Sequence, residues 1–152
     1  SSGGVVLVFP GGDYDSYRST FEQNTIDFNG RKGYVRTAIE ADVPIVPAVS
    51  IGGQETQLFL GRGTRIAKRL GLPKIRTDIL PLGIGFPFGV TSTIPANFPL
   101  PSKIVHEVLE PIHVVDQFGP NPDVDEVDAH VRAVMQSALD RLAEQRRFPV
   151  IG

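Results

Sequence analysis

Two short apolar runs, each ending near a pair of glycines, organise the hydrophobic and polar positions along this chain. The first, Val5–Phe9, stops just before Gly11-Gly12, and the second, Val43–Ile51, stops at Gly52-Gly53. Runs rich in β-branched residues predict strands buried on both faces of a mostly parallel sheet. The chain between them is long enough for one crossover, so the pattern predicts a β-α-β unit. Ligands of such sheets lie beyond the carboxyl ends of the strands, so we expect the site at the two Gly-Gly pairs.

Further patterns predict three helices and two more strands. Apolar positions at three-and-four spacing predict helices over Tyr34–Ala41, Arg62–Leu72 and Val124–Gln145. A strand is predicted over Ile79–Phe86 and a half-exposed strand over Lys103–Leu109, where polar and apolar residues alternate. The expected fold is one α/β domain with a mostly parallel, mixed sheet and helices on its faces.

The composition of the chain excludes several kinds of functional site and partner. The chain has 152 residues, no cysteine, three histidines and a net charge of −2. The lack of cysteine excludes disulfides, thiolate ligands and a cysteine nucleophile. The three scattered histidines argue against a histidine-rich metal site, which leaves carboxylates as the candidate metal ligands. The slight negative charge argues against nucleic acid as a partner. The chain lacks an initiator Met and enters an apolar run almost at once, so we interpret it as part of a longer protein.

Two adjacent segments indicate contact with a membrane surface. Arg62–Arg76 carries several basic residues and no acidic one, while Ile79–Ser102 has no charged side chain. Five prolines in the second segment prevent a membrane-spanning helix. Charge attraction and apolar contact together favour peripheral attachment, which we expect at the cytoplasmic side of a membrane. The alternatives are a solvated surface helix and a packed proline-rich connection.

Three motifs follow one another in the first third of the chain. They are Phe-Pro-Gly-Gly at 9–12, Gly-Arg-Lys-Gly at 30–33 and Val-Pro-Ile-Val-Pro at 43–47. In this order they resemble the C-terminal half of a glycerolipid acyltransferase domain, as in lysophosphatidic-acid and diacylglycerol acyltransferases. The resemblance implies transfer of a fatty acyl group from a thioester, acyl-CoA or an acyl carrier protein, to a hydroxyl of a glycerolipid or related lipid, without a further cofactor. A non-catalytic lipid-binding or scaffold protein on the same fold is the alternative.

Two departures from the family pattern refine these expectations. The family's His-x-x-x-x-Asp motif is absent, because the residues five positions beyond His106, His113 and His130 are not acidic. In the family this His is the general base, so the resemblance implies that proton transfer belongs to a missing N-terminal half and that this chain alone is inactive. Where lysophosphatidic-acid enzymes have Glu-Gly-Thr-Arg, Gly11–Tyr14 reads Gly-Gly-Asp-Tyr, the form of the diacylglycerol branch. We therefore expect an acceptor without a phosphate.

The candidate site residues lie in and beside these motifs. We expect the Gly-Gly turn and Arg18 to shape the acceptor site, and Arg31 and Lys32 to hold anionic groups. Glu55 either orients a substrate hydroxyl or caps its own turn, and parts of Ile79–Phe98 line an acyl path. The predicted substrate-binding residues are Phe9, Pro10, Gly11, Gly12, Asp13, Arg18, Arg31, Lys32, Gln54 and Glu55. No residue of the chain is assigned to catalysis or to a metal.

Overall fold

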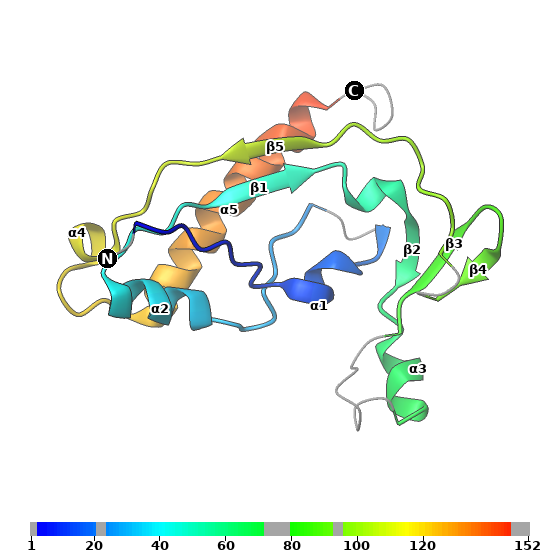
Figure 1. The fold of residues 1–152 in the computed structure, drawn as a ribbon, viewed down its shortest axis with the longest axis horizontal. Helices are drawn as coiled ribbons and strands as arrows, with labels where there is room; N and C mark the ends of the chain where they lie inside the picture. Colours follow the sequence, from blue (N-terminus) through cyan, green and yellow to red (C-terminus); the bar gives the residue numbers. More distant parts are fainter. Residues whose placement is uncertain (1–2, 21–23, 72–79, 93–95, 147–152) are drawn as a thin grey trace.

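A computed structural model describes residues 3–20, 24–71, 80–92 and 96–146 of the chain. Figure 1 shows the long helix α5 crossing a two-stranded sheet, with a three-stranded sheet and α3 at the other end of the molecule. In chain order the elements are α1 (Gly12–Ser16), α2 (Gly33–Ala41), β1 (Ala48–Ile51), the 3-10 turn η2 (Gln54–Thr56), β2 (Leu58–Gly61), α3 (Thr64–Arg69), β3 (Leu82–Gly85), β4 (Gly89–Thr91), β5 (Val105–Val108), α4 (Val114–Phe118) and α5 (Val124–Gln145).

The strands that the structure describes all pair antiparallel. β1 pairs with β5, and an isolated bridge between Ile45 and Ile112 continues this pairing. The second sheet has the order β2-β3-β4, in which each strand pairs with the next along the chain. The α/β class is confirmed, but the prediction of a mostly parallel sheet is wrong for this part of the chain. The reason is that β1 takes its neighbour from the returning strand β5 rather than from the first apolar run.

The first apolar run, Val5–Phe9, does not form the predicted buried strand. Val5 is 97% exposed and Phe9 is 76% exposed. None of the described strands includes this run, which in the view of Figure 1 passes as extended chain below β1 and across α5. β-branched residues favour strands only where a neighbouring strand supplies backbone hydrogen bonds and a surface to pack on. Val5–Phe9 has neither in the described chain, which explains why the prediction is wrong.

Most of the other predicted elements are confirmed. α2 begins one residue before its predicted range, β5 lies within its predicted range, and α5 has the predicted bounds. Asp123 caps α5, because its carboxylate accepts a hydrogen bond from the Asp125 amide at 2.9 Å. β3 forms over Leu82–Gly85 of the predicted strand, and α3 over Thr64–Arg69 of the predicted helix. The remaining parts of those two predictions reach into residues 72–79, outside the described chain.

The core holds α2, α4 and α5 together. Val35 of α2 and the valines Val127 and Val131 of α5 are almost completely buried, and Ile112 and Val114 pack with them. Burying a valine side chain contributes about 1.5–3 kcal/mol, so these contacts fix α2 against α5. None of the described helices is long and apolar enough to cross a membrane.

A polar network reinforces the same contact between α2 and α5. The Tyr34 hydroxyl donates to Asp128 Oδ1 at 2.9 Å, and Arg132 Nε donates to Asp128 Oδ2 at 2.9 Å. Burial, and then the hydrogen bond to Asp128, raises the pKa of Tyr34 above its usual value. Asp128 is buried on α5, but both of its oxygens have a donor. This network fixes the start of α2, and with it the Arg31-Lys32 pair.

Candidate functional site

The Pro-Gly-Gly turn leads the extended run into the short helix α1. The amide of Gly12 donates to the Phe9 carbonyl at 3.2 Å, and the Asp15 amide donates to the Gly11 carbonyl at 3.3 Å. Gly12 has φ +53°, and a Cβ at Gly11 would lie 2.4 Å from the Asp15 Cβ. Gly12 is therefore favoured because of its backbone conformation, and Gly11 because there is no room for a side chain.

The guanidinium of Arg31 lies over this turn. Arg31 Nη1 donates to the Gly11 carbonyl at 3.0 Å and lies 3.5 Å from the Pro10 carbonyl. A Cβ at Gly12 would lie 2.8 Å from the same nitrogen, so Gly12 leaves the room that the guanidinium occupies. Arg31 remains exposed, which places a positive charge at the surface of the turn.

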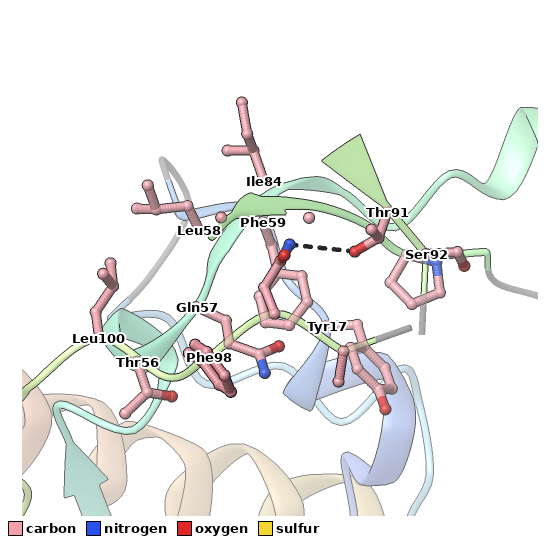
Figure 2. A pocket seen from close by; sticks show the side chains of 15 residues that line it. Tyr17, Thr56, Gln57, Leu58, Phe59, Ile84, Thr91, Ser92, Phe98 and Leu100 are labelled. Carbon is pink, nitrogen blue, oxygen red and sulfur yellow. Dashed lines mark hydrogen bonds between the residues drawn. The ribbon is translucent and has the colours of Figure 1, made fainter. Parts of the chain in front are cut away.

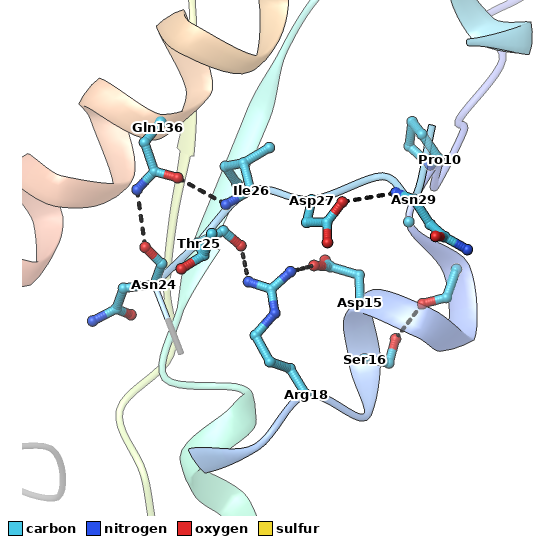
Figure 3. A network of polar contacts seen from close by, with 12 residues as sticks. Pro10, Asp15, Ser16, Arg18, Asn24, Thr25, Ile26, Asp27, Asn29 and Gln136 are labelled. Atoms are coloured by element: carbon cyan, nitrogen blue, oxygen red, sulfur yellow. Dashed lines mark hydrogen bonds and ion pairs between the residues drawn. The ribbon is translucent and has the colours of Figure 1, made fainter. Parts of the chain in front are cut away.

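Arg18 follows α1 and is buried, and Figure 3 shows its guanidinium between Asp15 and Thr25. Its side chain is 3% exposed, forms an ion pair with Asp15 at 2.5 Å and donates to the Thr25 carbonyl. Burial raises the pKa of the Asp15 carboxyl, although the neighbouring Arg18 guanidinium opposes this shift. Arg18 thus connects α1 to the segment around Thr25, a position in which it supports the turn from below.

The segment around Thr25 is in turn held by α5. Gln136 donates from Nε2 to the Asn24 carbonyl at 2.9 Å and accepts from the Ile26 amide at 2.8 Å (Figure 3). One side chain thereby satisfies both a backbone donor and a backbone acceptor. The turn, Arg18 and α5 form a continuous chain of contacts, which sequence reasoning did not find because Gln136 is distant in sequence.

Lys32 contacts α5 rather than the Gly-Gly turn. Its Nζ donates to Asp125 Oδ1 at 2.8 Å. The hydrogen bond and the charge of Lys32 lower the pKa of Asp125. Asp125 lies in the first turn of α5, where the helix dipole also favours an anion. Lys32 therefore joins the starts of α2 and α5.

The second Gly-Gly pair belongs to a separate polar cluster around Glu55. Arg146 forms two contacts with the Glu55 carboxylate, at 2.6 and 2.9 Å, and both side chains are largely buried. Ser102 Oγ donates to the Gly52 carbonyl at 2.8 Å and lies 3.3 Å from Glu55 Oε2. Gly52 has φ +100°, and a Cβ there would lie 2.2 Å from the Lys103 carbonyl oxygen. Glu55 thus holds its own turn against the end of α5, while its role toward a substrate hydroxyl stays a prediction.

A hollow of about 240 Å³ lies under the three-stranded sheet (Figure 2). The rings of Tyr17 and Phe59 meet edge to face with centroids 5.5 Å apart, and Phe98 also lines the hollow. Gly83, opposite Phe59 in the sheet, adds no side chain to this space. Polar side chains, among them Gln57, Thr91 and Asn97, line the rest of the hollow. Apolar and aromatic walls with a few placed polar groups are typical of ligand sites. The segment 79–98, predicted to line an acyl path, supplies much of this lining.

The structure thus divides the predicted site residues among three places. Gly11, Gly12, Arg18 and Arg31 meet at the first turn, Lys32 pairs with α5, and Glu55 belongs to the Arg146 cluster. The side chains of Asp13 and Gln54 lie outside the described structure. Among the described residues, no group of three or more His, Asp or Glu side chains is placed to hold a metal ion.

Comparison with known families identifies the class. The sequence model of the diacylglycerol acyltransferase family matches residues 1–148, so the chain belongs to this family. The expected resemblance to glycerolipid acyltransferases is thereby confirmed. No solved structure matches the chain.

Individual relatives agree with this assignment. An uncharacterized protein of Mycobacterium tuberculosis is 33% identical over 158 residues, which cover all of this chain and 41% of the relative. A mouse protein named DGAT1/2-independent enzyme synthesizing storage lipids is 33% identical over 71% of this chain and 32% of its own length. Mouse diacylglycerol O-acyltransferase 2-like protein 6 is 29% identical over 96% of this chain and 44% of its own length. The chain therefore spans less than half the length of these relatives.

The geometry of the first turn predicts that Gly12→Ala destabilises the protein. Alanine at φ +53° costs about 1–2 kcal/mol, and its Cβ also displaces the Arg31 guanidinium. Denaturant unfolding measures the loss. The matched control is Gly53→Ala, because Gly53 has φ −65° and open space at the Cβ position. Equal losses in the two variants would contradict this account of the turn.

The Glu55–Arg146 pair should contribute measurably to stability. A double-mutant cycle with Glu55→Gln and Arg146→Gln is expected to give a coupling free energy of about 1–3 kcal/mol, because the pair is largely buried and makes two contacts. The exposed pair Arg141–Glu107 is the control, with an expected coupling below about 1 kcal/mol. A coupling no larger than that of the control would mean that Glu55 does not anchor its turn.

Proposed function

We propose that the intact protein containing this chain transfers a fatty acyl group from a thioester to a hydroxyl of a glycerolipid or related lipid. The observation that carries the proposal is the match to the diacylglycerol acyltransferase family across nearly the whole chain. The geometry is compatible with it, since an exposed cation, a glycine turn and an aromatic hollow lie on one polypeptide. The acyl donor is acyl-CoA or an acyl carrier protein.

In this proposal the first turn binds the polar end of a substrate. The exposed guanidinium of Arg31 attracts a phosphate, for example that of coenzyme A, because guanidinium groups bind phosphates through paired hydrogen bonds. Gly11 and Gly12 allow the ligand to approach the backbone closely. Arg18 supports this turn from below, since it is buried and bonded to Asp15.

The aromatic hollow receives part of the acyl chain. Its volume of about 240 Å³ is below the ~300–1,000 Å³ typical of complete small-molecule sites. We therefore assign to it a segment of the chain rather than the whole ligand. Tyr17 follows directly after α1, so the polar turn and the apolar hollow are joined by one short element.

Proton transfer is assigned to the part of the protein outside this chain. The three histidines, His106, His113 and His130, are all exposed, and none belongs to the residues described at the turn or the hollow. General base catalysis contributes about 10²–10⁴-fold to such reactions. Without this group, bound substrates would remain unreacted.

This assignment predicts activity for the intact protein and none for residues 1–152 alone. The measurement is the transfer of a radiolabelled acyl group from acyl-CoA to diacylglycerol, followed by separation of the lipids. The isolated chain, checked for folding by circular dichroism, is the comparison. Acyl transfer by the isolated chain would overturn the division of roles, and absence of transfer by the intact protein with either thioester donor would overturn the proposed function.

The acceptor should be a lipid hydroxyl without a phosphate. The reason is that the turn reads Gly-Gly-Asp-Tyr and its buried Arg18 already bonds Asp15. A competition assay with diacylglycerol and lysophosphatidic acid measures the preference in the intact protein. Arg31→Gln should raise KM for acyl-CoA and leave the acceptor preference unchanged, with Arg36→Gln, an exposed residue of α2, as the control. A preference for lysophosphatidic acid that disappears in Arg31→Gln would assign Arg31 to the acceptor instead.

A further inference from the structure

The three-stranded sheet carries a row of exposed apolar side chains, two of which also line the hollow with part of their atoms. Leu58, Ile84 and Val90 stand directly opposite one another across β2, β3 and β4. They are 41%, 42% and 61% exposed, respectively. In Figure 2 the side chain of Ile84 and the ring of Phe59 extend to opposite sides of the strands, although Ile84 also belongs to the lining of the hollow. We call the row Leu58, Ile84 and Val90 the outer sheet face.

The turn between β3 and β4 extends this apolar surface. Phe86 and Phe88 are 75% and 56% exposed. Asn97 braces the turn, because it accepts from the Phe88 amide at 3.0 Å and donates to the Gly89 carbonyl at 2.9 Å. The two aromatic rings are thus presented by a turn whose backbone is held in place. Exposed apolar patches of this kind mark contact surfaces for proteins or lipids.

The charges beside the outer sheet face distinguish between those two partners. Arg65, Lys68 and Arg69 of α3 are exposed, and residues 56–77 include no acidic side chain. Figure 1 shows α3 next to the sheet, and the Leu80 amide donates to the Arg62 carbonyl at 2.9 Å. The start of α3 is therefore tied to the chain that enters β3. An apolar surface beside these exposed cations is complementary to lipids with anionic headgroups.

We propose that the outer sheet face, the Phe86–Phe88 turn and the cations of α3 dock the protein onto a bilayer that contains anionic phospholipids. The apolar side chains enter the headgroup region and the cations attract the lipid phosphates. Each cation near an anionic leaflet contributes about a fivefold gain in binding, which weakens with added salt. The aromatic rings favour the boundary between headgroups and acyl chains. In this orientation the hollow, which Leu58 and Ile84 also line, lies close to the lipid surface.

This proposal is independent of the proposed function, because binding to vesicles is measured without an acyl donor. It also gives the peripheral attachment proposed from the sequence a definite surface. The competing explanation is that the remainder of the intact protein covers the outer sheet face. Docking on a bilayer requires that lipid can reach the outer sheet face in the intact protein, whereas coverage by the rest of the protein would prevent this.

The test is flotation of the intact protein with vesicles of phosphatidylcholine alone and of phosphatidylcholine mixed equally with phosphatidylglycerol. We expect binding to the mixed vesicles that decreases with salt. The double variant Ile84→Ser with Val90→Ser should bind about tenfold more weakly, because two apolar side chains are lost from the contact. The triple variant Arg65→Gln, Lys68→Gln and Arg69→Gln should lose most of its preference for the anionic lipid.

Matched controls separate this surface from general effects. Val108→Ser removes a valine that is 71% exposed on β5, and Arg36→Gln removes an exposed cation of α2; neither should change binding. The variant Phe88→Trp gives a second measurement. On addition of mixed vesicles its indole emission should shift to shorter wavelength, and brominated lipids should quench it.

Three results would overturn the proposal. One is binding to mixed vesicles that neither set of substitutions weakens beyond the controls. Another is no binding to either kind of vesicle. The third is loss of stability in Ile84→Ser with Val90→Ser, together with an indole in Phe88→Trp that is already shielded before vesicles are added. That third result would assign the outer sheet face to a contact within the intact protein.

Discussion

The structure depends on one helix, α5, and on the burial of its valines against α2. Val127 and Val131 bury almost completely against Val35, which fixes two elements on which the candidate site is built. Two polar side chains of this helix and one directly after its end contact three segments around the site. Asp128 holds Tyr34, Gln136 holds the loop before α2, and Arg146 holds Glu55. These contacts give order to the otherwise glycine-rich and irregular chain around the site.

The sequence predicts the local features well, because they depend on nearby residues. The bounds of α5 follow from its apolar spacing and from Asp123 as its cap. The sequence predicts a turn at Gly11 and Gly12 that requires glycine. In the structure Gly12 has a positive φ, and Gly11 leaves no room for a Cβ beside Asp15. The Asp15–Arg18 pair also had a sequence signal, since the two residues are three positions apart, but that spacing alone does not distinguish a buried pair from an exposed one.

What the sequence did not predict depends on long-range partners. The Glu55–Arg146 pair joins residues 91 positions apart in the chain, and a single sequence contains no signal for such a contact. The prediction of a mostly parallel sheet was wrong for the same reason. An apolar run such as Val5–Phe9 shows that a strand is favoured, but not which neighbour it pairs with, and pairing decides between parallel and antiparallel.

The two exposed apolar segments differ in a way that bears on their partners. Val5–Phe9 has side chains exposed along its whole length and belongs to no described strand, so its backbone is suited to strand pairing. In the outer sheet face β3 is paired on both sides and β2 and β4 are each paired on one side, so fewer backbone groups are available there, and cations stand beside the strands. Backbone pairing requires another polypeptide, whereas apolar side chains beside cations match a lipid surface. The same residue types therefore lead to different partners because their backbones are satisfied differently.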